Sequence, residues 1–188
     1  MHRFSLFTVL LALAVVSACR PAAAPVTVGS KPISVNDVPA DDAPRRPLKP
    51  LGEMNWTTFE GTVQKLRDFE GKVVILDFWA TNCPPCIEEI PHLLSLQREY
   101  AADLQIVGLH VGDDEDRLKV PEFVERLKIT YPLATPEDEL SRFVFGKETA
   151  IPQTAIFGRD GKFIRKIVGF NPEIQKELDA AVASAIKQ

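Results

Sequence analysis

Cysteine is scarce in this chain of 188 residues, and several classes of protein are excluded by what the sequence lacks. Its three cysteines cannot supply the two pairs that a zinc ribbon needs. The net charge of −4 gives no support for nucleic-acid binding, and the charges are mixed along the chain rather than collected in blocks. No internal repeat is present. These absences leave redox chemistry at the two cysteines that lie close together as the first hypothesis.

The N-terminal segment has the pattern of an export signal. A short basic stretch, residues 1–3, precedes the apolar run Phe4–Val16, which is too short for the roughly 20 residues that a membrane-spanning helix needs. The segment ends in Val16-Ser17-Ala18-Cys19, which resembles the lipobox of bacterial lipoproteins. We therefore predict a signal peptide at 1–18 and an acylated Cys19 that anchors an exported bacterial protein to a membrane. A secretory peptide with a chance cysteine is the alternative.

Residues 19–50 are expected to be a tether. The stretch from Arg20 to Pro50 contains seven of the 15 prolines of the chain and shows no apolar periodicity. About 30 such residues would have a root-mean-square span of roughly 30 Å as a flexible coil. The remaining residues, 51–188, are enough for one domain that buries about two thirds of its unfolded surface without structural disulfides.

The first half of this domain predicts a βαβα order. Residues 72–80 form a nearly continuous apolar run, which is typical of a strand buried on both faces. A second apolar strand is expected at 104–111, and a helix at 117–128 follows a cluster of acids, Asp113–Asp116. Between the two strands, apolar residues recur at helical spacing: Ile87, Ile90, Leu93, Leu94 and Tyr100.

The second half predicts two more strands and a last helix. After an irregular stretch with a short helix near 138–145, strands at 154–157 and 163–168 are joined through Asp160-Gly161. This dipeptide favours a type I′ hairpin, so the two strands should be antiparallel. Asn171 should cap the final helix, whose apolar stripe begins at Ile174. The fold class is thus α/β, with a mixed central sheet and helices on both faces.

The motif Cys83-Pro84-Pro85-Cys86 lies between the first predicted strand and the helix that follows it. Two thiols three residues apart in a first helical turn lie on one face within disulfide reach, and the helix dipole favours a thiolate there. We assign Cys83 as the nucleophile and Cys86 as the residue that resolves a mixed disulfide. The alternative is a permanent disulfide, although so tight a loop gives little entropic stabilisation.

Asp77 is unusual because it interrupts an apolar strand. A buried carboxylate is costly unless it is paired or protonated, and burial tends to raise its pKa toward the range that is useful for proton transfer. Asp77 is therefore a candidate proton acceptor. The alternative is an acid at a strand end that faces solvent.

Several of these residues carry a family resemblance. The segment from Asp77 to Cys86, Pro91 beyond it, and Ile151-Pro152 ahead of a strand are similar to the thioredoxin fold. The stretch from Asn55 to the cysteines more narrowly resembles the membrane-anchored TlpA/ResA-like thiol-disulfide oxidoreductases. The resemblance covers 51–188 and is weak over 131–150. Asn82 departs from it, because many relatives have a second tryptophan there.

The resemblance implies roles for further residues. Asp77 would lie beneath Cys86 and accept its proton, and Glu89 would assist the cysteines unless it is an ordinary surface glutamate. Ile151-Pro152 would form a cis-proline loop whose backbone pairs with an extended substrate, with a trans, purely structural proline as the alternative. Trp79 would cover one side of the disulfide, with a simple core role as the alternative. Pro91 would be the kink proline of the active-site helix.

We therefore expect a lipid-anchored thiol-disulfide oxidoreductase that works through the Cys83–Cys86 disulfide and needs no bound cofactor. The resemblance implies reduction of disulfides in exported proteins, for example apocytochromes or copper-site proteins, and recharging by a membrane thiol carrier. No nucleic-acid partner is expected.

Two alternatives from other functional classes stay open. The same thiols could deliver copper, because soft thiolates favour copper(I). A thiol peroxidase shares the fold, but its Pro-x-x-x-Thr-x-x-Cys signature is absent, since Thr81 lies two residues before Cys83. As metal ligands, His110 alone and the acids Asp113–Asp116 are weak candidates, and structural roles are favoured for both.

Overall fold

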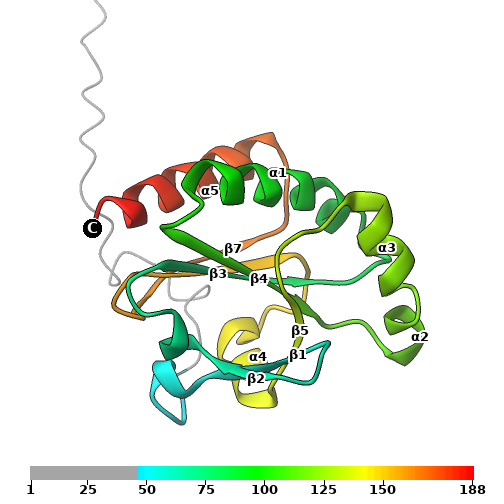
Figure 1. The fold of residues 1–188 in the computed structure, drawn as a ribbon, viewed down its shortest axis with the longest axis horizontal. Helices are drawn as coiled ribbons and strands as arrows, with labels where there is room; N and C mark the ends of the chain where they lie inside the picture. Colours follow the sequence, from blue (N-terminus) through cyan, green and yellow to red (C-terminus); the bar gives the residue numbers. More distant parts are fainter. Residues whose placement is uncertain (1–45) are drawn as a thin grey trace, which may run out of the picture. The chain divides into compact units, whose positions relative to one another are not determined.

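Seven strands form one mixed sheet in the part of the chain that the structure, a computed structural model, describes: residues 46–188 (Figure 1). The strand order is β2-β1-β5-β4-β3-β6-β7. Strands β3, β4 and β5 are parallel, and every other neighbouring pair is antiparallel. The strands are β1 (Asn55–Thr58), β2 (Val63–Lys65), β3 (Val73–Trp79), β4 (Leu104–His110), β5 (Leu133–Pro136), β6 (Gln153–Phe157) and β7 (Phe163–Val168).

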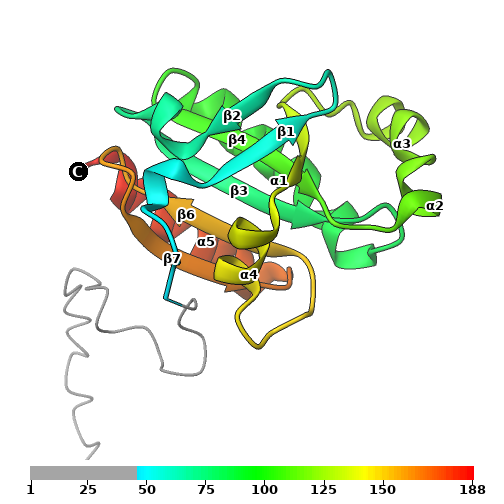
Figure 2. The ribbon, with the colours of Figure 1, turned by 90° about the horizontal axis from the view of Figure 1, so that it is seen from below.

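Helices cover both faces of the sheet, as predicted. Figure 1 shows α1 and α5 on one face and α4 on the other, and α4 lies in front in the view of Figure 2. No helix of the described part is long and apolar enough to cross a bilayer. The helices are α1 (Pro84–Tyr100), α2 (Asp114–Arg117), α3 (Val120–Leu127), α4 (Asp138–Phe145) and α5 (Pro172–Ile186).

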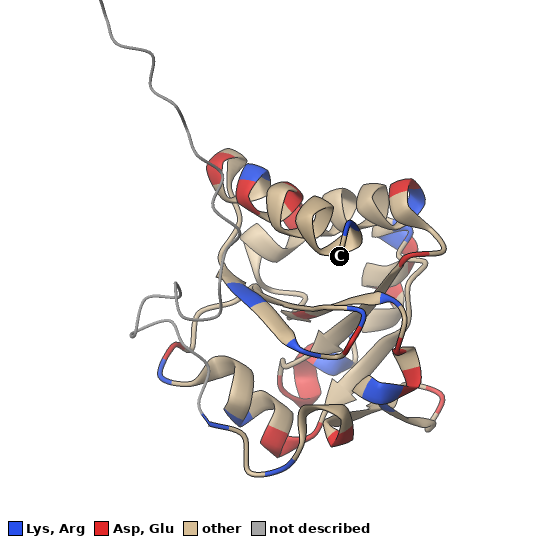
Figure 3. Cartoon of the chain, turned by 90° about the vertical axis from the view of Figure 1, so that its left-hand side faces the viewer, with Lys and Arg blue, Asp and Glu red and all other residues tan. Residues whose placement is uncertain are grey.

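The predicted signal peptide, Cys19 and the linker as far as residue 45 lie outside the described residues. In the described part, Lys and Arg alternate with Asp and Glu over the face drawn in Figure 3. This is the mixed pattern of charge that the sequence predicts.

Strand β3 is an interior strand of the sheet, between β4 and β6, and its side chains contribute to two core clusters, one on each face. All seven of its residues are buried, because helices pack on both of its faces. Since side chains alternate along a strand, Val73, Ile75 and Trp79 join the cluster beneath α1, α3 and α5. The intervening Val74, Leu76 and Phe78 join the cluster beneath α4. Asp77 falls on the α1 face by the same alternation.

The two long helices form for the reasons that the sequence indicates. Helix α1 begins directly after Cys83 and buries Ile90, Leu93 and Leu94 against the sheet. Helix α5 is capped by Asn171, whose side chain accepts hydrogen bonds from the backbone N–H groups of Glu173 and Ile174. The predicted hairpin is also confirmed, because β6 and β7 pair antiparallel.

The turn of that hairpin is not the predicted type I′. Gly161 has a φ of 70°, whereas Asp160 is not among the residues with positive φ. The Gly161 N–H donates to the Gly158 carbonyl, and the Gly158 N–H donates to the Lys162 carbonyl. This is a three-residue loop that ends in a glycine bulge, and the strand register shifts beside it.

Two further predictions of the elements were incomplete. The helix expected at 117–128 is broken into α2 and α3, because Pro121 lacks an N–H and cannot continue a helix from Arg117; it lies instead in the first turn of α3. Strands β1, β2 and β5 were not predicted. Strand β5 lies in the stretch that was expected to be irregular.

Candidate active site

Cys83 and Cys86 form a disulfide at the N-terminus of α1. The sulfur atoms are 2.06 Å apart, and the two Cα atoms are 5.3 Å apart. Cys83 is the N-cap residue, and its sulfur accepts a hydrogen bond of 3.3 Å from the Cys86 N–H. Cys83 is 7% exposed and Cys86 is 1% exposed. The outer sulfur is therefore the one that a substrate can reach, in agreement with the assignment of Cys83 as nucleophile.

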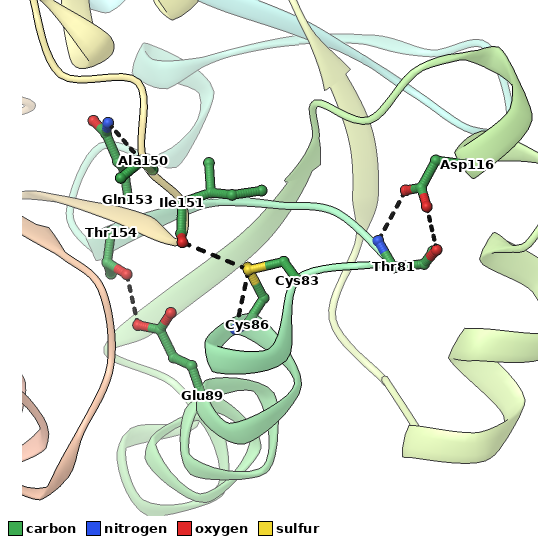
Figure 4. The surroundings of a disulfide bond; sticks show 9 residues. All are labelled: Thr81, Cys83, Cys86, Glu89, Asp116, Ala150, Ile151, Gln153 and Thr154. Carbon is green, nitrogen blue, oxygen red and sulfur yellow. Dashed lines mark hydrogen bonds between the residues drawn. A yellow bond between two sulfur atoms is a disulfide. The ribbon is translucent and has the colours of Figure 1, made fainter.

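The predicted cis-proline loop lies against this sulfur. The Ile151–Pro152 peptide bond is cis, and the Ile151 carbonyl oxygen lies 3.5 Å from the Cys83 sulfur (Figure 4). A disulfide sulfur has no proton, so this is a contact in the closed state; a reduced Cys83 thiol can donate to the same oxygen. Gln153 stabilises the loop, since its Nε2 donates to the carbonyls of Glu148 and Ala150 at 3.1 and 2.9 Å.

Two carboxyl groups are buried behind the disulfide. Asp77 and Glu89 are each 1% exposed, so neither faces solvent, and the two surface alternatives are wrong. Burial and the charge of Glu89 raise the pKa of Asp77 well above its ordinary value. Burial raises the pKa of Glu89 to about 7, although the Thr154 hydroxyl opposes the shift by donating to Glu89 Oε1 at 2.6 Å. Thr154 is the cross-strand partner of Asp77, which brings the three residues beneath α1.

Trp79 supports the site from the core. Its side chain is fully buried, and its ring stacks on Phe123 with the ring centroids 5.0 Å apart. It belongs to the same buried cluster as both cysteines. Trp79 therefore packs as a core residue, which was the alternative. A direct role of Trp79 in binding substrate stays a prediction.

A buried hydrogen-bonded group that the sequence did not reveal holds the loop before Cys83. Asp116 Oδ2 accepts from the Thr81 N–H at 2.8 Å, and Asp116 Oδ1 accepts from the Thr81 hydroxyl (Figure 4). His110 Nε2 also contacts Asp116 Oδ2 at 2.8 Å. Burial raises the pKa of Asp116, but the hydrogen bonds from Thr81 and His110 outweigh it and leave the pKa below its ordinary value.

The hydrogen bonds around Asp116 give structural roles to His110 and to the acids Asp113–Asp116, which were weak candidates for metal ligands. Asp113 caps α2 by accepting from the Asp116 N–H, and His110 packs edge-on against Trp79 as well as contacting Asp116. Within the described residues, no three His, Cys, Asp or Glu side chains are grouped so that they could hold a metal ion. The acids therefore start a helix, as favoured, but Asp116 turns inward rather than toward solvent.

This geometry can perform thiol-disulfide exchange. The outer sulfur lies at the positive end of a helix, where a backbone N–H can stabilise its thiolate. The inner thiol lies on the side of two carboxyl groups whose raised pKa values suit proton transfer near neutral pH. The Ile151 carbonyl offers an acceptor to an extended chain.

Comparison with known proteins agrees with this chemistry. The Redoxin family model matches residues 49–182. The chain is 31% identical over 124 residues to "Thiol-disulfide oxidoreductase ResA" of Bacillus cereus, covering 64% of this chain and 69% of the relative. A crystal structure of a "thiol:disulfide interchange protein, thioredoxin family protein" from Chlorobium tepidum matches with a TM-score of 0.62 and 28% identity, covering 77% of this chain and 99% of that one.

The predicted fold is thereby confirmed as thioredoxin-like. The ResA-like resemblance noted between Asn55 and the cysteines is confirmed as well. The chain belongs to the Redoxin family and is a thiol-disulfide oxidoreductase of the ResA-like group.

Proposed function

We propose that this enzyme is a lipid-anchored reductant that opens disulfide bonds in exported proteins. Two parts of this proposal come from sequence alone: export through residues 1–18 and attachment through an acylated Cys19. The reducing direction is argued from the active site. Apocytochromes and copper-site proteins, whose thiols must stay free in an oxidising compartment, are the substrate classes to test.

The reducing direction is inferred from the buried pair Asp77 and Glu89. A strongly oxidising dithiol, such as that of DsbA, owes its high potential to a stabilised reduced form with a low thiol pKa. Here burial and the charge of Glu89 raise the pKa of Asp77, and burial raises the pKa of Glu89 against the hydrogen bond from the Thr154 hydroxyl. A buried acidic pair does not stabilise a nearby thiolate, so the dithiol should give up its electrons readily.

The exchange would follow three steps. The Cys83 thiolate attacks one sulfur of the substrate disulfide, and the other substrate sulfur leaves as a thiolate that takes up a proton. The Cys86 thiol then loses its proton to the carboxylate pair. The Cys86 thiolate attacks the Cys83 sulfur and breaks its bond to the substrate, and the second substrate sulfur leaves as a thiolate that takes up the proton held by the carboxylate pair. Two electrons have passed to the substrate, and Cys83–Cys86 is again a disulfide, ready to be reduced by a membrane thiol carrier.

A redox titration against glutathione tests the direction. We expect a midpoint potential below about −220 mV, in the range of reducing thioredoxin-like proteins. A midpoint near the roughly −120 mV of DsbA would overturn the proposal. The double variant Cys83→Ser, Cys86→Ser is the control, since it should not respond to the glutathione ratio.

A trapping experiment in the native host identifies the substrate. The Cys86→Ser variant cannot resolve the mixed disulfide, so Cys83 should retain its partner covalently. We expect trapped partners with paired cysteines, released by dithiothreitol and absent from the double serine variant. Trapping of cytosolic proteins alone would contradict the exported location.

A further inference from the structure

Six buried side-chain atoms have no hydrogen-bond partner within the described residues. A buried polar group without a partner is unfavourable, so each such atom needs an explanation. Four of the five residues concerned pack in or beneath the apolar cluster under α1, and the fifth follows the cis-proline. The atoms are Asp77 Oδ1 and Oδ2, Trp79 Nε1, Glu89 Oε2, Tyr131 OH and Gln153 Oε1.

Tyr131 is the titratable member of this group to which the exchange chemistry assigns no role. It lies between α3 and β5 and is buried in the same cluster as both cysteines. Gly108 of β4 is the cross-strand partner of Asp77. A Cβ atom at Gly108 would lie 3.0 Å from Tyr131 Cε2 and 2.9 Å from Trp79 Nε1. The ring edge of Tyr131 and the indole N–H of Trp79 therefore lie over Gly108, directly beside Asp77. They fit there because Gly108 has no side chain.

The electrostatics of the cluster agree with this placement. Burial raises the pKa of Tyr131 well above its ordinary value, and the charges of Asp77 and Glu89 raise it further. The charge of Asp77 acts on Tyr131 from β3 and that of Glu89 from α1, while Cys86 of α1 titrates only when it is reduced. From α3, the neighbours Val120 and Val124 carry no charge.

We propose that Tyr131, Asp77 and Glu89 together hold one buried water molecule, through which the Tyr131 hydroxyl donates to the carboxylate pair. A buried water typically makes about three hydrogen bonds to groups that otherwise have none, and this cluster offers a donor hydroxyl and carboxylate oxygens from two residues. The inference deepens the proposed function, because the pair it acts on is the proton acceptor for Cys86. Tyr131 is thus a positioning residue that acts through the carboxylates.

The sign of the effect follows from the donor. A hydrogen bond donated to an ionised carboxylate stabilises the ionised form and lowers its pKa. Tyr131 therefore limits the rise in pKa that burial imposes on Asp77 and Glu89. Removing the hydroxyl should raise the pKa of the pair, and losing the water with it would desolvate the carboxylates further, which shifts the pKa in the same direction.

The direct test is a ¹³C NMR titration of the Asp and Glu carboxyl carbons in the oxidised full chain, where the cysteines do not titrate. In Tyr131→Phe, the ring stays and the hydroxyl is lost. We expect the apparent pKa of the pair to rise by about one unit from the value near 7 of Glu89. The matched control is Tyr100→Phe at the only other tyrosine, which lies at the far end of α1, and it should leave that pKa unchanged.

A second measurement follows exchange itself, with insulin as the disulfide substrate. The pH midpoint of insulin reduction should move up by a similar amount in Tyr131→Phe, with the alkaline rate preserved. An NMR titration that is unchanged in Tyr131→Phe overturns the inference, whatever the activity. If the carboxyl titration shifts but neither wild type nor variant reduces insulin, the proposed function fails and the Tyr131 inference stands. A lowered melting temperature without a shifted titration would indicate a packing role only.

Discussion

Thr81 lies two residues before Cys83, and both its backbone N–H and its hydroxyl donate to the buried carboxylate of Asp116. His110 contacts the same carboxylate from the end of β4. Gly112 allows this arrangement, because a Cβ atom there would lie 2.4 Å from Asp116 Oδ2. The position of the Cys83 loop relative to the Ile151 carbonyl therefore depends on side chains from outside the dithiol motif.

We predict that Thr81→Val weakens this loop and that Thr81→Ser does not. Valine has nearly the shape of threonine but leaves Asp116 Oδ1 without a donor, whereas serine keeps the hydroxyl. Loss of a hydrogen bond to a buried charged group should lower the free energy of unfolding by about 2 kcal/mol, and insulin reduction should slow several-fold. Urea unfolding and insulin turnover measure the two effects. Equal behaviour of the valine and serine variants would show that the hydroxyl is not required.

At the scale of the site residues, sequence reasoning found the groups that belong to a recognisable pattern. The dithiol, Asp77 within an apolar strand, and Ile151-Pro152 before a strand could all be identified in this way. Tyr131 and Asp116 could not, because each reaches the site from a segment without a motif. The N–H of Thr81 and the carboxylate of Asp116 are 35 residues apart in sequence, and only the parallel pairing of β3 with β4 brings them together.

At the scale of elements, long apolar runs and capped helices were predictable and short edge strands were not. Strand β3 is a nearly continuous apolar run, and helix α1 buries apolar residues at helical spacing, so each gives a clear signal. Strand β2 has three residues, and its Val63 is 59% exposed, so its sequence gives no comparable signal. Strand β5 pairs with β1 across more than seventy residues of chain, a partner that local sequence does not specify.

The capping of α5 gives a prediction at this scale. Asn171 satisfies two backbone N–H groups that have no acceptor within the helix. Asn171→Ala should lower the free energy of unfolding by about 1 kcal/mol, while Asn171→Asp should keep most of the stability. Chemical denaturation of the oxidised protein measures both variants. Insulin reduction should be unaffected in either one, and a large loss of activity would indicate that α5 does more than cover the sheet.

At the scale of the whole molecule, the buried carboxyl pair makes stability depend on pH. The ordinary pKa of Glu89 is 4.5, and its pKa in the folded protein is about 7. Between these values the folded state holds a proton that the unfolded state has released, so the free energy of unfolding falls as the pH rises. The loss attributable to Glu89 is roughly 3 kcal/mol, and the raised pKa of Asp77 acts in the same direction.

We predict that Glu89→Gln removes the part of this dependence that comes from Glu89, while the buried Asp77 retains its own part. Glutamine can still accept from the Thr154 hydroxyl but carries no charge at any pH. The variant should therefore be more stable than wild type at pH 8 and lose less stability than wild type between pH 5 and pH 8. Urea unfolding of both oxidised proteins across this range measures the slopes. Parallel slopes would contradict a buried Glu89 that ionises near neutral pH.

The depth of the outer sulfur also limits what the enzyme can act on. Only 7% of Cys83 is exposed, and the cis-proline loop lies beside it. A disulfide inside a rigid, folded domain cannot approach such a recessed sulfur atom. An extended, unfolded segment that contains a disulfide can lie alongside the loop. In the proposed reducing direction, the recessed nucleophile would spare the stable disulfides of mature neighbours and act on chains that are still folding.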